Sequence, residues 1–131
     1  MAVRILVIED NDANLALMDY LLQAFGYVTL LAQGGITGLS IAKHELPDLI
    51  LCDIQMPVLD GFAVAKILKK DDILCNIPLI AVTALAMFDD QNKILTAGFN
   101  GYITKPIIPE TFIDELEGWL INHKSIAGKT L

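Results

Sequence analysis

Two hydrophobic patterns alternate along the chain. Short, continuously apolar stretches rich in β-branched residues, of which residues 5–8 are the first, are typical of strands covered on both faces. The stretches between them place apolar residues every three or four positions, as in Leu15, Met18 and Leu22, which is typical of amphipathic helices. The pattern predicts strands at residues 5–8, 27–31, 48–52, 77–82 and 99–103, and helices at residues 12–25, 35–46, 61–70, 87–97 and from Pro109 onward.

Polar and glycine residues mark where the first predicted helix begins and ends. Asp12 is expected to cap it and Gly26 to end it. On the second helix, Ile36 and Leu46 belong to the apolar side, and on the third helix Ile67 does. We therefore expect these three side chains to be buried in the core.

The alternation of five strands with five helices favours a doubly wound α/β fold. Such a fold has a parallel sheet with helices on both faces and right-handed crossover connections. The 131 residues fit one domain of ordinary size. We expect a single domain at residues 1–122, followed by a C-terminal tail at residues 123–131.

Composition excludes several classes of protein. Hydrophobic residues make up 54% of the chain and charged residues 19%, so the chain can form a core and is not disordered. The net charge is -7 and Arg4 is the only arginine, which argues against direct nucleic-acid binding. The longest nearly apolar stretch, residues 77–88, is shorter than the roughly 20 residues that span a membrane. No signal peptide opens the sequence, so we expect a cytoplasmic protein in which Cys52 and Cys75 are reduced thiols.

The polar residues that could carry chemistry come directly after the predicted strands. Glu9 and Asp10 follow the first strand, Asp53 follows the third, Thr83 ends the fourth and Lys105 lies just beyond the fifth. In a doubly wound sheet these positions meet at the carboxyl edge, where ligands bind. Three converging carboxylates would repel one another, and a hard divalent cation such as Mg²⁺ would relieve this repulsion. Carboxylates, metal, hydroxyl and ammonium together form a site for a phosphoryl group.

Four sequence blocks at these strand ends resemble those of one known family. The blocks are Val-Ile-Glu-Asp-Asn at 7–11, Asp-Ile-Gln-Met-Pro at 53–57 with Gly61, Ala-Val-Thr-Ala at 81–84, and Tyr-Ile-Thr-Lys-Pro at 102–106. In order and spacing they resemble the receiver domains of response regulators in two-component and phosphorelay signalling. The resemblance covers roughly residues 3–121 and is greatest to single-domain regulators of the DivK type. It implies a flavodoxin-like fold with strand order 2-1-3-4-5.

The resemblance assigns roles to the residues of the site. Asp53 would be the phosphoacceptor, whose carboxylate attacks a phosphohistidine and becomes an acyl phosphate. Mg²⁺ would be bound by Glu9, Asp10 and Asp53 together with the main-chain carbonyl of Gln55. Lys105 would pair with a phosphoryl oxygen, and the bond between it and the following proline would be cis.

The resemblance also implies a switch and partners. Thr83 and Tyr102 would form the switch pair that remodels the surface of the fourth helix, fifth strand and fifth helix. The donor would be a histidine kinase or a histidine phosphotransfer protein, and a downstream protein would recognise the altered surface. Because the last helix is acidic and has no arginine, we expect a monomer or a weak dimer. We further hypothesise that the bulky Leu85 slows hydrolysis of the acyl phosphate.

Other functions are less compatible with the residues present. A phosphate-independent pseudo-receiver, acting only as an interaction module, would have no need of the complete set of site residues. A phosphohydrolase is disfavoured because Gln55 cannot protonate a leaving group. We expect no turnover enzyme, only a phosphoacceptor with slow intrinsic autodephosphorylation. His44 and His123 are predicted to be solvated side chains and not phosphohistidine donors.

Overall fold

The computed structural model describes residues 2–84 and 87–121. Across these residues the chain forms five strands, five α-helices and one short 3₁₀ helix. In chain order they are β1 Arg4–Ile8, α1 Asp12–Ala24, β2 Val28–Ala32, α2 Gly35–Glu45, β3 Leu49–Asp53, α3 Gly61–Lys70, the 3₁₀ helix Leu74–Asn76, β4 Leu79–Thr83, α4 Phe88–Thr96, β5 Gly101–Thr104 and α5 Pro109–Ile121.

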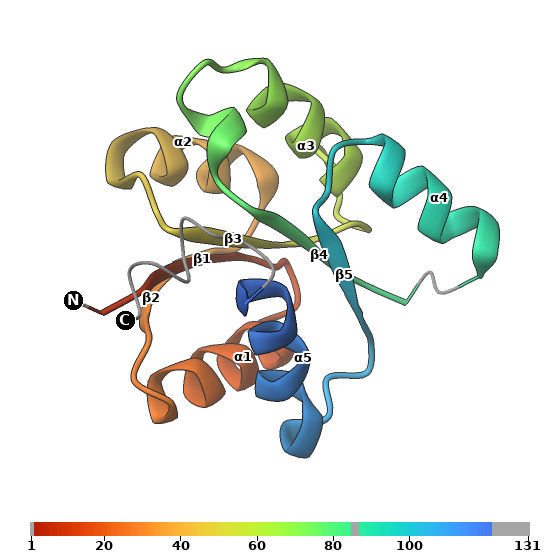
Figure 1. The fold of residues 1–131 in the computed structure, drawn as a ribbon. Helices are drawn as coiled ribbons and strands as arrows, with labels where there is room; N and C mark the ends of the chain where they lie inside the picture. The colour runs from red at the N-terminus through yellow and green to blue at the C-terminus, as the bar shows by residue number, and fades with distance from the viewer. Residues whose placement is uncertain (1, 85–86, 122–131) are drawn as a thin grey trace.

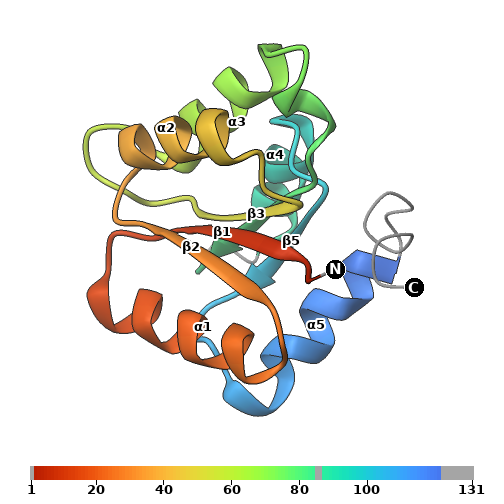
Figure 2. The same ribbon diagram turned by 90° about the vertical axis from the view of Figure 1, so that its left-hand side faces the viewer.

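All strand pairs are parallel, and the sheet has the order β2-β1-β3-β4-β5. Helices α1 and α5 cover one face, and α2, α3 and α4 cover the other (Figures 1 and 2). This is the doubly wound fold, with the strand order 2-1-3-4-5, that the sequence predicted. Every predicted strand and helix is present, with ends that differ from the prediction by at most a few residues.

Strands β1, β3 and β4 are almost entirely buried on both faces, which explains why they are continuously apolar, whereas the edge strand β2 is partly exposed. Along β1, Ile5 and Val7 join one hydrophobic core beneath α1 and α5, which we call the α1/α5 core. Leu6 and Ile8 point to the opposite face and join the α2/α3/α4 core. Cys52 is fully buried in the α2/α3/α4 core as a free thiol, and Cys75 is also free, as predicted.

The first helix is capped by a neighbour of the predicted residue. The side chain of Asn11 accepts a hydrogen bond of 2.9 Å from the Asn14 amide, so Asn11 and not Asp12 is the N-cap. Asp12 is the first helical residue, and its carboxylate accepts a hydrogen bond from Gln33. Gly26 follows the helix with a φ of 89°, a conformation that glycine adopts without strain, as its predicted role as a stop requires.

Three apolar side chains that were expected in the core are exposed. Ile36 is 65% exposed, Leu46 49% and Ile67 42%, so this part of the prediction was wrong. Small residues take their place on α2, because the helix lies close to the sheet. A Cβ atom on Gly38 would lie 2.5 Å from the Cδ1 atom of Ile8, so only glycine permits this approach.

The part of the chain that the structure describes contains no helix that is both long and apolar enough to cross a membrane. The predicted domain boundary at residue 122 and the tail at residues 123–131 lie outside the described residues and stay predictions.

Candidate functional site

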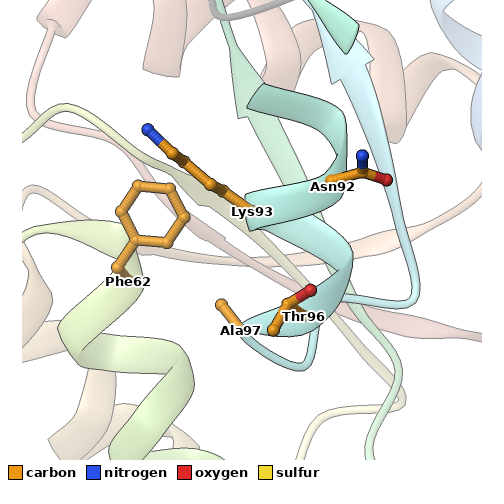
Figure 3. Close-up of a pocket in the computed structure, with 5 residues that line it drawn as sticks. All are labelled: Phe62, Asn92, Lys93, Thr96 and Ala97. Carbon is orange, nitrogen blue, oxygen red and sulfur yellow. The ribbon is translucent and has the colours of Figure 1, made fainter. Parts of the chain in front are cut away.

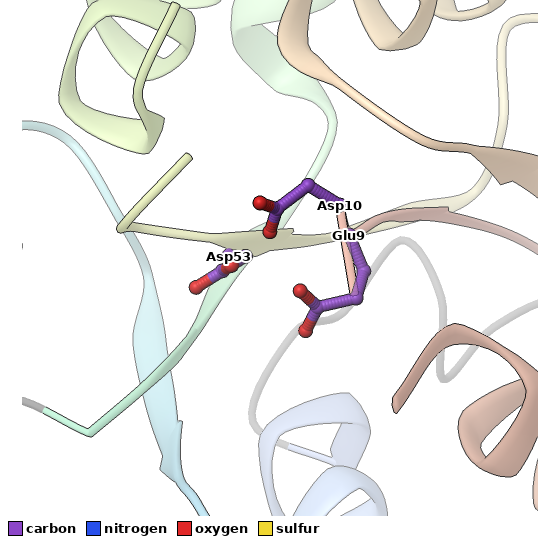
Figure 4. A group of neighbouring side chains, drawn as sticks. All are labelled: Glu9, Asp10 and Asp53. Carbon is purple, nitrogen blue, oxygen red and sulfur yellow. The ribbon is translucent and has the colours of Figure 1, made fainter. Parts of the chain in front are cut away.

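The fold brings three carboxylates together at the carboxyl edge of the sheet. Glu9 and Asp10 follow β1, and Asp53 is the last residue of β3. Because Ile8 pairs with Cys52 in the parallel register, the residues that follow them are neighbours. One oxygen from each carboxylate lies within 4.8 Å of the others (Figure 4). Glu9 and Asp53 are buried, whereas Asp10 is accessible to solvent.

A lysine that follows the edge strand β5 also contacts this cluster. The Nζ atom of Lys105, just after β5, lies 3.0 Å from Oε1 of Glu9 and 3.2 Å from Oδ1 of Asp53. The Lys105 amide donates a hydrogen bond of 2.8 Å to the carbonyl of Thr83, which ties the loop after β5 to the end of β4. The bond between Lys105 and Pro106 is cis, as predicted.

The pKa values follow from burial and from these contacts. Burial raises the pKa of Asp53 to about 7, and the neighbouring Glu9 acts in the same direction, while Lys105 opposes both. Burial alone would lower the pKa of Lys105, but its contacts with Glu9 and then Asp53 outweigh this effect and hold its pKa above the ordinary value. The ammonium is therefore charged at neutral pH, and burial disfavours the charged form of Asp53 in the metal-free site.

The arrangement suits a divalent cation. Among the described residues, one ammonium contacts two of the three clustered carboxylates, and the raised pKa of Asp53 shows that negative charge is disfavoured there. An all-oxygen set of this kind is what Mg²⁺ prefers. The Gln55 amide donates a hydrogen bond of 3.2 Å to Oδ1 of Asp53, so the loop that would supply the predicted carbonyl ligand begins beside the carboxylate.

The loop after Asp53 is held close to the end of β3. The Gly61 amide donates a hydrogen bond of 2.8 Å to the carbonyl of Ile54. A Cβ atom on Gly61 would lie 2.4 Å from the carbonyl oxygen of Asp53, so glycine is needed for this close approach. Asp60 caps α3 by accepting a hydrogen bond of 2.9 Å from the Ala63 amide. These contacts hold the loop after the candidate phosphoacceptor against the end of β3.

The predicted switch residues occupy neighbouring strands. Thr83 is buried at the end of β4 and pairs in register with Thr104 of β5. Tyr102 lies two residues earlier on β5 and is half-buried, and its ring packs against Trp119 of α5. In the sequence Trp119 is an apolar residue of the last predicted helix, and nothing in its spacing points to Tyr102. Leu85 lies outside the described residues.

His44 is not part of this site. His44 is exposed near the end of α2, where its Nδ1 atom lies 2.8 Å from the carbonyl oxygen of Ser40. His123 lies outside the described residues. A separate hollow of about 450 Å³ lies between α3 and α4 and contains none of the predicted site residues (Figure 3). Its lining residues are Phe62, Asn92, Lys93, Thr96 and Ala97.

Fold and site together define a class of protein. Residues 5–117 match the response regulator receiver domain family, so the chain belongs to this family of two-component signalling. Within it, the chain is 42% identical over 120 residues to the polar-differentiation response regulator DivK of Brucella anthropi and to that of Brucella abortus strain 2308. Each alignment covers 92% of this chain and 98% of the relative.

Solved structures of receivers superpose on the same fold. The chemotaxis protein CheY4 of Vibrio cholerae aligns with a TM-score of 0.86 at 25% identity, covering 92% of this chain and 100% of that one. The receiver domain of the sensor histidine kinase PA1611 from Pseudomonas aeruginosa PAO1 aligns with a TM-score of 0.81 at 32% identity, covering 91% and 98%. The latter structure has a magnesium ion coordinated in its active-site cleft.

Proposed function

We propose that this chain is a phosphoacceptor that receives its phosphoryl group on Asp53 from a phosphohistidine. An ionised oxygen of Asp53 attacks the phosphorus, the bond between phosphorus and the histidine nitrogen breaks, and an acyl phosphate forms. The observation that carries the proposal is the buried Asp53 carboxylate at the end of β3, in contact with Lys105 at 3.2 Å. The same ammonium would pair with an oxygen of the transferred group.

The metal site belongs to this proposal. Glu9, Asp10, Asp53 and the main-chain carbonyl of Gln55 would hold Mg²⁺. When bound, the ion supplies positive charge for the phosphoryl oxygens, which gain negative charge during transfer. Lys105 acts in the same direction on the nucleophile, because it lowers the pKa of Asp53 and so favours the ionised form.

The output would pass through the surface formed by α4, β5 and α5. The hydroxyl of Thr83 would donate a hydrogen bond to the phosphoryl group on Asp53, and the side chain of Tyr102 would change position in response. This shifts the population between two arrangements of the surface. The chain would be cytoplasmic. A histidine kinase or a histidine phosphotransfer protein would be the donor, and a downstream protein would recognise the altered surface. The chain itself would be a monomer or a weak dimer, and it would lose its phosphate slowly without acting as a turnover enzyme.

Intact-mass measurement after incubation with acetyl phosphate and Mg²⁺ tests the proposal. The parent protein should gain one phosphoryl group that hydroxylamine removes, as expected of an acyl phosphate. Asp53→Asn should gain none, whereas the exposed control Asp72→Asn should behave as the parent does. A parent protein that stays unmodified would instead point to a phosphate-independent pseudo-receiver.

A further inference from the structure

The contact between Tyr102 and Trp119 joins the two layers of the fold around an edge of the sheet. β5 is the last strand of the sheet, and Tyr102 on it packs against the α2/α3/α4 core. Trp119 on α5 packs against the α1/α5 core on the opposite face. The two rings nevertheless meet, with their centroids 6.4 Å apart and their planes inclined by 47°. The side chain proposed to move on phosphorylation therefore touches α5 directly.

Trp119 also contacts the backbone that carries Tyr102. Its Nε1 atom donates a hydrogen bond of 3.3 Å to the carbonyl oxygen of Tyr102. The indole lies so close to β5 that a Cβ atom on Gly101 would lie 2.5 Å from its Cδ2 and Cε2 atoms. Glycine at position 101 thus makes room for the indole, and one side chain holds both the ring and the carbonyl of Tyr102.

Two roles of Trp119 are compatible with these contacts, and they differ in what they predict. Indole over an edge strand shields polar backbone, which stabilises the fold whatever the state of Asp53. The ring contact adds a second effect, because aromatic pairs contribute about 0.5–1.5 kcal/mol and Tyr102 cannot turn away without losing that contact. Only the ring contact favours one position of the Tyr102 side chain over another.

We propose that Trp119 is a positioning residue that holds Tyr102 in the arrangement found with an unmodified Asp53. This inference rests on the proposed function, since it assumes that phosphorylation of Asp53 moves Tyr102. A phosphoryl group on Asp53 must then break the contact between Tyr102 and Trp119 before the surface of β5 and α5 can change. By linkage, any change that weakens the contact favours the phosphorylated arrangement and tightens binding of a phosphoryl mimic.

Titration calorimetry with fluoroberyllate and Mg²⁺, a mimic of the phosphoryl group, measures this linkage. Trp119→Leu removes the ring contact and the hydrogen bond, and it should bind the mimic about fivefold more tightly than the parent. Gly101→Ala pushes the indole off β5 and should change the affinity in the same direction. Gly101→Ala tests the inference if Trp119→Leu does not fold.

The matched control removes a different contact of α5. Tyr27 donates a hydrogen bond of 2.9 Å to Glu117, two residues before Trp119 on the same helix. Tyr27→Phe should lower the free energy of unfolding and leave the affinity for the mimic unchanged. If Trp119→Leu and Gly101→Ala also keep the parent affinity, or bind more weakly, Trp119 only covers the edge strand and the inference is wrong.

Fluorescence provides a second readout, because Trp119 is the only tryptophan of the chain. Emission of the parent should change when fluoroberyllate and Mg²⁺ are added, and emission of Asp53→Asn should not. A parent that binds the mimic with unchanged emission would contradict the role of Trp119 while leaving the proposed function intact. A parent that neither binds the mimic nor accepts phosphate would overturn the proposed function, and this inference with it.

Discussion

The ammonium of Lys105 lies 3.0 Å from the carboxylate of Glu9, although β5 and β1 are separated in the sheet by β3 and β4. The same ammonium contacts Asp53, so one cation faces two carboxylates. The side chain of Lys105 is 20% exposed, whereas that of Glu9 is 0% and that of Asp53 is 3% exposed. The lysine therefore provides positive charge to two buried carboxylates that have little access to water.

Removing that ammonium should destabilise the protein. Lys105→Met is expected to lower the free energy of unfolding by about 3 kcal/mol near neutral pH, because it leaves buried carboxylates uncompensated. Urea denaturation without added metal measures the effect. Lys66→Met, on the exposed side of α3, is the matched control and should stay within about 0.5 kcal/mol of the parent. Equal losses in the two variants would mean that the ion pair contributes nothing to stability.

The stability of the metal-free protein should depend on pH through Asp53. Its pKa is about 7 in the folded protein, above the ordinary value of about 3.9 in an unfolded chain. A raised pKa contributes stability that is fully present below about pH 4 and is lost as the pH rises through about 7. Asp53→Asn has no such loss and should gain about 1–3 kcal/mol relative to the parent between about pH 5 and pH 8.

Chemical denaturation at several pH values in the presence of a chelator measures this difference. Asp72→Asn replaces an exposed carboxylate and serves as the control for the loss of one negative charge. If the gap between Asp53→Asn and the parent stays constant across the pH range, the carboxylate is not held in a charge-disfavouring site.

Magnesium should stabilise the folded protein, because an ion bound only by the folded state shifts the unfolding equilibrium. A concentration of about 100 times the dissociation constant adds about 2.7 kcal/mol. Asp10→Asn should abolish most of this gain, because one carboxylate of the cluster is lost. Asp12→Asn is the control, because Asp12 is the first residue of α1 and its carboxylate is hydrogen-bonded to Gln33; it should respond to Mg²⁺ as the parent does. Thermal unfolding with increasing Mg²⁺ separates the variants, and an identical response of both would argue against the site.

A strained turn near the site should be relieved by substitution. Val58 has a φ of 69°, and the Leu59 amide donates a hydrogen bond of 2.8 Å to the carbonyl of Pro57 across it, which makes a γ-turn. The valine side chain is 92% exposed, so no packing compensates for the strain of a β-branched residue. Val58→Asn should raise the free energy of unfolding by about 1 kcal/mol, since asparagine tolerates this conformation.

Urea denaturation checks this stabilisation. Ile73 is the matched control, because it is 65% exposed but has an ordinary φ of -91°. Ile73→Asn should not stabilise the protein. A stabilisation shared by both variants would come from the loss of exposed apolar surface and not from the turn.

The sequence by itself determined the secondary-structure elements and which polar residues follow the strands at the candidate site. Strands that are covered by helices on both faces are apolar throughout. The polar residue at the end of such a strand, such as Asp53, can therefore be recognised from the sequence alone. The exposed Ile36 and Ile67 show where this reasoning fails, because periodicity does not reveal how closely a helix approaches the sheet. On α2, Gly38 lies against Ile8, and small residues make the contact that larger ones were expected to make.

The sequence predicted that Lys105 and Glu9 lie at the same edge of the sheet, and only the tertiary structure decided which of the distant residues are in direct contact. Lys105 and Glu9 are far apart in the chain, and their ion pair requires both the strand order and the position of the loop after β5. The contact of Tyr102 with Trp119 requires two residues from opposite faces of the sheet to meet around its edge. Local patterns record what each segment buries, whereas such contacts depend on where whole elements pack, and that is set by the free energy of the complete fold.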